Sequence, residues 1–148
     1  MNPVLRTEAA TVIRRPLRTV FPFVADAENA RRFRPDIVAV TRTSGTPTAV
    51  GATYHQVVKF AWREVDVWLE NTEYEPDRTL SFTAHKPDAV TVKTAFNFQT
   101  IELAHTRVMV TTESEAHSLS RLTRYLQKRE VEALQGLKRD LESRPPGP

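Results

Sequence analysis

The chain has 148 residues, no cysteine and a net charge of +3. Its length suits one domain, and the lack of cysteine excludes disulfides, a thiol nucleophile and a thiolate-bound metal. No stretch approaches the roughly 20 apolar residues of a membrane-spanning helix, and the first residues show no signal peptide. We therefore expect a cytoplasmic protein with no integral membrane segment. Basic residues form pairs, such as Arg14 and Arg15, rather than runs, so we expect no nucleic-acid partner.

The first third of the chain predicts a strand and two short helices. Residues 4–14 are rich in threonine, valine and isoleucine, which is typical of a strand. Pro16 suits the first residue of a helix, and Pro22 should kink or shorten that helix because it removes a hydrogen-bond donor. Asp26 is a good N-cap for a second helix over residues 27–33, which Pro35 ends.

The middle of the chain predicts six further strands joined by short turns. Apolar and polar residues alternate over residues 37–43, 51–60, 64–75, 80–84, 90–98 and 108–112. Turn-forming residues separate these runs at 44–47 and 76–78. Sequential strands with short links form an antiparallel sheet. The alternation gives that sheet one dry face and one wet face.

Residues 118–142 predict one long amphipathic helix. Apolar residues recur at helical spacing on one side, and charged residues occupy the other. The apolar stripe consists of Leu119, Leu122, Leu126, Ala133, Leu137 and Leu141. A single helix cannot bury its own stripe, so this one should lie on the dry face of the sheet. The predicted domain covers residues 1–143, and the proline-rich residues 144–148 are expected to form a disordered tail.

The predicted fold class is therefore α+β, a seven-stranded curved antiparallel sheet around a long C-terminal helix, with two short helices between the first two strands. This order of elements resembles the START-like, helix-grip superfamily, also called SRPBCC or the polyketide cyclase/dehydrase and lipid-transport group. The passage from Arg15 to Asn29 resembles the opening strand-to-helix passage of that family. Residues 73–82 resemble its middle hairpin, and residues 134–142 resemble the end of its long helix.

The resemblance implies a helix-grip, or Bet v 1-like, fold with a cavity for a hydrophobic or amphipathic small molecule. Its members include lipid carriers, polyketide aromatases and co-chaperones, which share a cavity rather than a catalytic motif, so the fold alone does not specify a reaction.

Apolar residues of the expected cavity wall would supply affinity, and a few polar residues would orient a ligand. The apolar candidates are Val58, Val67, Leu69, Phe82, Phe96, Phe98, Val110, Leu122 and Leu126. The polar candidates are Tyr54, Gln56, Tyr125, Arg129 and Glu130. Tyr125 and Arg129, one helical turn apart, suit a carboxylate or phenolate ligand, or they form an ordinary amphipathic edge.

Glu130 is the most informative of these candidates because it lies within the apolar stripe of the helix. No cation stands three or four positions away, so the usual helical salt bridge is not available. One hypothesis is that its carboxylate faces the cavity and binds or protonates a ligand group. The alternative is that it lies at the cavity mouth or pairs with an arginine from the short helices.

Three functions remain open at this point. The favoured one is binding of a lipid-like or polyketide-like small molecule, and the second is a cyclase or dehydratase with Glu130 as the best candidate acid or base. The third is a protein-interaction module, which exposure of Trp62 or Trp68 beside apolar neighbours would favour. We expect no cofactor and, from the histidine spacing, no metal. The protein is expected to be a monomer or a homodimer.

Overall fold

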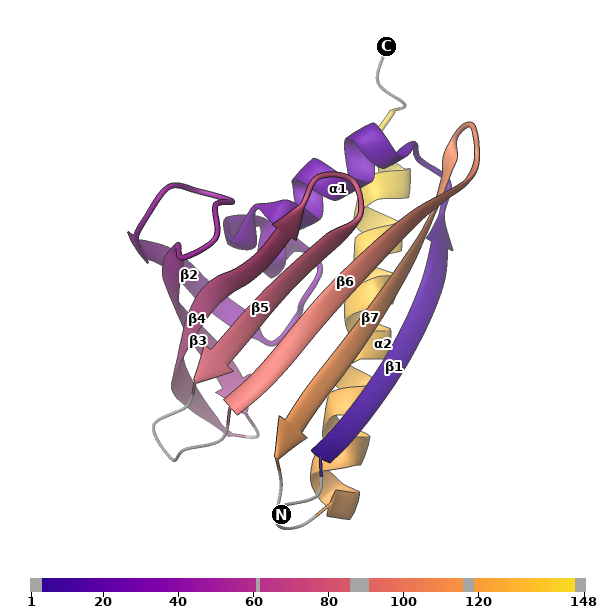
Figure 1. The fold of residues 1–148 in the computed structure, drawn as a ribbon. Coiled ribbons are helices and arrows are strands. Elements are labelled where there is room, and N and C mark those ends of the chain that lie inside the picture. The colour runs from indigo at the N-terminus through magenta and orange to yellow at the C-terminus, as the bar shows by residue number, and fades with distance from the viewer. Residues whose placement is uncertain (1–3, 61, 86–90, 116–118, 146–148) are drawn as a thin grey trace.

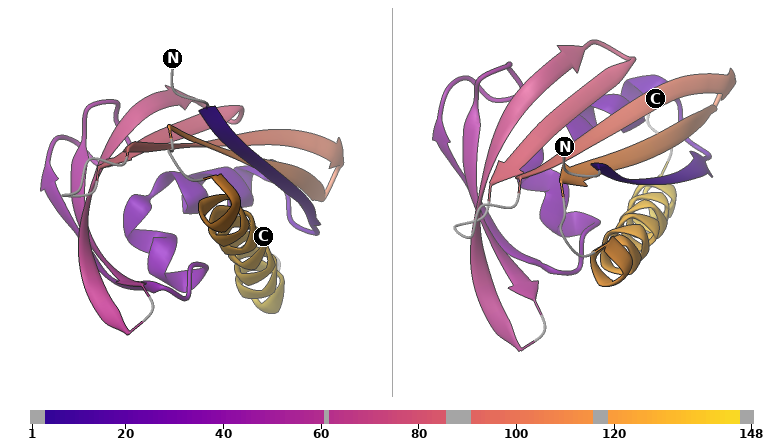
Figure 2. Two further views of the ribbon diagram at one scale, coloured as in Figure 1. Left: turned by 90° about the horizontal axis from the view of Figure 1, so that it is seen from below. Right: turned by 60° about the horizontal axis from the view of Figure 1, so that its bottom comes forward.

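In the computed structural model of this protein, a seven-stranded antiparallel sheet curves around three helices (Figures 1 and 2). The structure describes residues 4–60, 62–85, 91–115 and 119–145. Its elements are β1 (Val4–Ile13), α1 (Leu17–Ala25), η1 (Ala27–Arg32), β2 (Ile37–Ser44), β3 (Thr53–Phe60), β4 (Arg63–Glu75), β5 (Thr79–His85), β6 (Thr91–Glu102), β7 (His105–Glu115) and α2 (Leu119–Ser143). The strands lie in the order β1-β7-β6-β5-β4-β3-β2. The prediction of an α+β helix-grip fold is confirmed.

The two short helices differ in detail from the prediction. Pro16 is the N-cap of α1 rather than its first residue, with extended backbone at φ −69° and ψ 155°. Its carbonyl accepts the backbone N–H of Val20 at 3.1 Å. Pro22 lies inside α1, which is nine residues long and therefore short, as predicted. Asp26 caps the next segment by accepting the N–H of Glu28 at 3.0 Å, but that segment, η1, is a 3-10 helix.

All three helices lie on the concave face of the sheet (Figure 2). The sequence suggested α2 as the one large apolar partner of this face, yet α2 packs mainly along β1 at one edge. The short helices cover part of the remaining surface, and η1 packs against β2. They bury Val20, Phe21 and Val24 from α1 in the same core as Leu134 and Leu137 from α2. None of the described helices is long and apolar enough to span a membrane.

α2 comes very close to the segment after η1 at Gly136. A Cβ atom at this position would lie 2.5 Å from the carbonyl oxygen of Phe33. Only a residue without a side chain allows the two backbones to approach this closely. The contact brings Arg34, the next residue of the chain, to the surface of α2.

Gly136→Ala should therefore destabilise the protein, although alanine is favoured over glycine inside helices by about 1 kcal/mol. The added methyl group would meet backbone atoms of Phe33 that cannot rotate away, and overpacking of this kind costs about 1–3 kcal/mol. Urea unfolding measures the change, with Gln135→Ala at an exposed position of α2 as the control. A Gly136→Ala variant more stable than the wild type would contradict the close approach.

The end of α2 is fastened to the turn between β1 and α1 through Glu142. Its carboxylate accepts the backbone N–H of Arg14 at 2.8 Å and the ammonium group of Lys138 at 2.6 Å. Arg15 donates to the backbone carbonyls of Glu142 and Arg144 at 2.8 and 2.6 Å. Arg144, the first residue of the predicted tail, thus makes contacts with the domain, whereas residues 146–148 lie outside the described structure.

Burial alone would raise the pKa of Glu142, but the donors from Arg14 and Lys138 outweigh it and lower the pKa from 4.5 to about 2.

Because this pKa is lower in the folded chain, the contribution of Glu142 to stability is complete above about pH 4.5 and is lost as the pH falls through about 2. Glu142→Gln should lower the free energy of unfolding at pH 7 by about 2 kcal/mol, the scale of hydrogen bonds to a charged group. It should also reduce the loss of stability between these two pH values. Urea unfolding over a pH series measures both effects, with the exposed Glu132→Gln as control. Unchanged acid dependence in Glu142→Gln would assign that dependence to other carboxylates.

Candidate ligand-binding site

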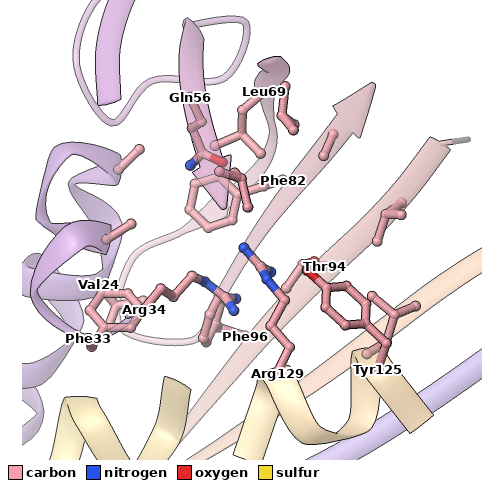
Figure 3. A pocket seen from close by; sticks show the side chains of 17 residues that line it. Val24, Phe33, Arg34, Gln56, Leu69, Phe82, Thr94, Phe96, Tyr125 and Arg129 are labelled. Carbon is pink, nitrogen blue, oxygen red and sulfur yellow. The ribbon is translucent and has the colours of Figure 1, made fainter. Parts of the chain in front are cut away.

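A cavity of about 90 Å³ lies between the concave face of the sheet and the helices. Side chains from β3, β4, β5, β6, α1, η1 and α2 line it (Figure 3). The structure brings many of the sequence candidates to this wall. They are Gln56, Val58, Val67, Leu69, Phe82, Phe96, Tyr125, Leu126 and Arg129.

Other candidates lie elsewhere. Tyr54, Phe98 and Val110 are buried on the inner side of the sheet but do not line the cavity. Phe98, for example, packs edge-on against Phe21 of α1, with ring centroids 5.1 Å apart. Glu130 is buried outside the lining. The side chain of Leu122 lies outside the described part of the structure.

Several lining residues were not predicted. They are Val24, Ala27, Ala30, Phe33, Arg34, Ala84, Val92 and Thr94. Ala84, Val92 and Thr94 could have been predicted from the sequence, because they share strand parity with Phe82 and Phe96. The lining residues from α1, η1 and the following segment could not be predicted in this way, since strand alternation does not show how the short helices pack on the sheet.

Four charged side chains form a chain of ion pairs beside the cavity, in which Arg34 and Glu130 are buried and Arg129 and Asp36 are partly buried. Arg34 donates two hydrogen bonds to the carboxylate of Glu130, at 3.2 and 3.1 Å. Arg129 donates through Nε to Asp36 at 2.6 Å, and its Nη1 lies 3.6 Å from Glu130. Glu130 is 0% exposed and Arg34 is 7% exposed, so both charges depend on this pairing. Of the arrangements considered for Glu130, the structure shows the pair with an arginine next to the short helices.

The two guanidinium groups remain cationic although Arg34 is buried and Arg129 is partly buried. Burial lowers the pKa of Arg34, and Glu130 opposes this effect. Burial also disfavours the charged form of Arg129, but Asp36 and Glu130 outweigh it, so the pKa of Arg129 is raised. Arginine stays protonated in proteins at neutral pH. Burial raises the pKa of Tyr125, so its hydroxyl keeps its proton and is a donor.

The polar part of the cavity surface is rich in hydrogen-bond donors. Figure 3 shows the side chains of Arg34 and Arg129 entering this region from different elements. Their counter-ions, Asp36 and Glu130, are not part of the lining. The buried Gln56 also faces the cavity, and its side chain makes no hydrogen bond to another described residue. Among the described lining residues, none is a carboxylate or a histidine.

Both tryptophans lie away from the cavity. Trp62 is 90% exposed between β3 and β4, and Trp68 is 47% exposed. The ring of Trp68 lies beside that of His55, with centroids 5.5 Å apart, and His55 is hydrogen-bonded to Asp66 at 2.8 Å. Within the described ranges, no group of three or more metal-ligating side chains comes together.

The pairing of Arg34 with Glu130 predicts strong coupling between the two residues. Arg34→Met or Glu130→Leu alone should cost about 3–5 kcal/mol, because each leaves one buried charge without its partner. The double variant should cost clearly less than the sum of the two. A double-mutant cycle by urea unfolding measures this, with the exposed pair Lys128 and Glu132, 3.9 Å apart, as the weakly coupled control. Additive losses would contradict a coupled buried pair.

No protein-family model and no curated protein matches this sequence. Among solved structures, the chain is similar to the Zhui aromatase/cyclase from Streptomyces sp. R1128, with a TM-score of 0.79 and 14% identity, covering 95% of this chain and 94% of that one. Ara h 8.0201 matches with a TM-score of 0.78 and 11% identity, over 96% of this chain and 100% of its own.

A third similar structure is the di-domain ARO/CYC BexL from the BE-7585A biosynthetic pathway. It matches with a TM-score of 0.78 and 16% identity, over 93% of this chain, and this chain spans 46% of that protein. At such identities the likeness shows the fold alone. The protein has the helix-grip fold, as the resemblance in its sequence predicts.

Proposed function

We propose that this protein binds a hydrophobic or amphipathic small molecule in the cavity between sheet and helices. The observation that carries the proposal is the cavity itself, a mostly apolar space on which a few polar side chains converge. Protein interiors contain few voids larger than a water molecule. A space of about 90 Å³ therefore differs from an ordinary packing defect, and its lining is typical of a small-molecule site.

The volume limits the size of the ligand. Drug-sized ligands occupy pockets of about 300–1,000 Å³, so this conformation suits a molecule of one ring or a short chain. A longer lipid-like or polyketide-like chain would require the wall to move outward. Each 100 Å² of apolar ligand surface that leaves water contributes about 2.5 kcal/mol, so apolar contact supplies most of the affinity.

A polyketide cyclase is the second candidate, and the two guanidinium groups favour it. Cations fixed beside an apolar cavity can stabilise the enolate oxygen that develops during such a ring closure. Two aromatase/cyclases also share the fold. However, Glu130, the candidate acid or base, is held by Arg34 outside the lining. Tyr125 keeps its proton, and no described lining residue is a carboxylate or a histidine that could act as a general base. For this reason binding is the better supported function.

A protein-interaction role is the least supported of the three. It rests on the exposed side chains of Trp62 and Trp68. Trp68 is paired with His55 on β3 and with His85 on β5, so its neighbours on the adjacent strands are polar rather than apolar.

Filling the cavity tests the proposed function. Ala84→Phe would place a ring inside the cavity, whereas Thr83→Phe puts the same ring on the other face of β5. We expect 4-ethylbenzamide, a neutral single-ring probe, to bind the wild type and Thr83→Phe, and to bind Ala84→Phe at least tenfold more weakly. Isothermal titration calorimetry measures the affinities, and circular dichroism checks that each variant is folded.

Equal binding to Ala84→Phe and to the wild type would place the ligand outside the cavity. Native mass spectrometry of the purified protein complements this test, because a small molecule that leaves on denaturation would identify a natural ligand directly.

A further inference from the structure

The arrangement of charge around the cavity leads us to propose that the ligand is a small apolar carboxylic acid whose carboxylate accepts hydrogen bonds from the cavity-facing N–H groups of Arg34 and Arg129. This proposal rests on the ligand-binding function above and names the chemical class of its ligand. It follows from unused hydrogen-bond donors, from the placement of the counter-ions and from the other polar groups of the wall.

The two arginines have more donors than their ion pairs use. Each guanidinium carries five N–H groups. Arg34 gives one bond from Nη1 and one from Nη2 to Glu130. Arg129 uses Nε for Asp36, and its Nη1 lies 3.6 Å from Glu130. Part of the donor capacity of Arg129 is taken up by a hydrogen bond to Tyr125. The remaining N–H groups belong to two side chains that line the cavity from different elements (Figure 3).

For the attraction of a ligand, the positions of the four charged groups relative to the cavity matter more than their net charge. Two arginines and two carboxylates make a network with no net charge, so a generally positive field does not attract the ligand. The cations face the cavity, however, and the carboxylates of Asp36 and Glu130 lie outside its lining. The positive charge of Arg129 also disfavours the charged form of Arg34 and lowers its pKa. Glu130 opposes this repulsion from outside the lining, because its Oε1 lies 3.2 Å from Nη1 of Arg34 and 3.6 Å from Nη1 of Arg129. An anion on the cavity side of the two guanidinium groups would oppose it further.

The neighbouring polar groups fit a carboxylate as well. A carboxylate only accepts hydrogen bonds, at about four positions. Tyr125 keeps its proton because burial raises its pKa, so its hydroxyl adds a donor on the same side of the cavity as Arg129. The amide of a ligand with the same shape has one acceptor oxygen but directs its NH₂ group at the remaining donors. A buried donor without an acceptor is strongly disfavoured.

The test compares two probes of almost the same shape on the wild-type protein. At pH 7, 4-ethylbenzoate should bind at least tenfold more tightly than 4-ethylbenzamide in isothermal titration calorimetry. Arg129→Gln should reduce the affinity for 4-ethylbenzoate at least tenfold. Lys128→Gln removes the same charge from an exposed neighbour and should leave that affinity unchanged.

The possible results separate this proposal from the function on which it rests. Equal affinities for the two probes would overturn the carboxylate site and leave the small-molecule function intact. Binding of neither probe would overturn both. If Arg129→Gln proves unfolded by circular dichroism, the comparison of the two probes on the wild type still decides the question, because it needs no variant.

Discussion

The buried pair between Arg34 and Glu130 is the interaction on which the cavity depends. Glu130 lies in the apolar stripe of α2, where an unpaired carboxylate would cost several kcal/mol. Its partner comes from the segment after η1, which lies directly on α2 because Gly136 has no side chain. The pair therefore connects the short helices to the long helix on the concave side of the sheet. It also leaves an arginine on the cavity wall and keeps the carboxylate away from it.

Most of the fold could be predicted because its elements have clear periods. Strand alternation and helical spacing specify their elements locally, without knowledge of the tertiary structure. The same alternation predicts which strand residues face inward, so Gln56, Val67 and Phe82 were correctly assigned to the inner face. It does not show which part of that face a helix covers. Phe98 faces inward with the correct parity, yet it packs beneath α1 against Phe21 instead of lining the cavity.

The polar half of the site could be predicted only in part. Glu130 indicates from sequence alone that a buried carboxylate needs a partner, and the short helices are a reasonable place to look for it. Arg31, Arg32 and Arg34 all lie in or beside η1, however, and no periodicity separates them. Only the folded chain shows that Arg34 turns inward while the other two are exposed. The choice depends on how η1 and α2 approach each other, which is a long-range property of the structure.

Intermolecular NOEs between 4-ethylbenzoate and the protein, measured by NMR, test most directly whether the cavity is the binding site. If it is, the ring protons of the probe should give NOEs to the methyl groups of Val58, Val67 and Leu126, which line the cavity on β3, β4 and α2. NOEs confined to the exposed side chains of Trp62 or Trp68 would place the probe on the outer surface and contradict binding in the cavity.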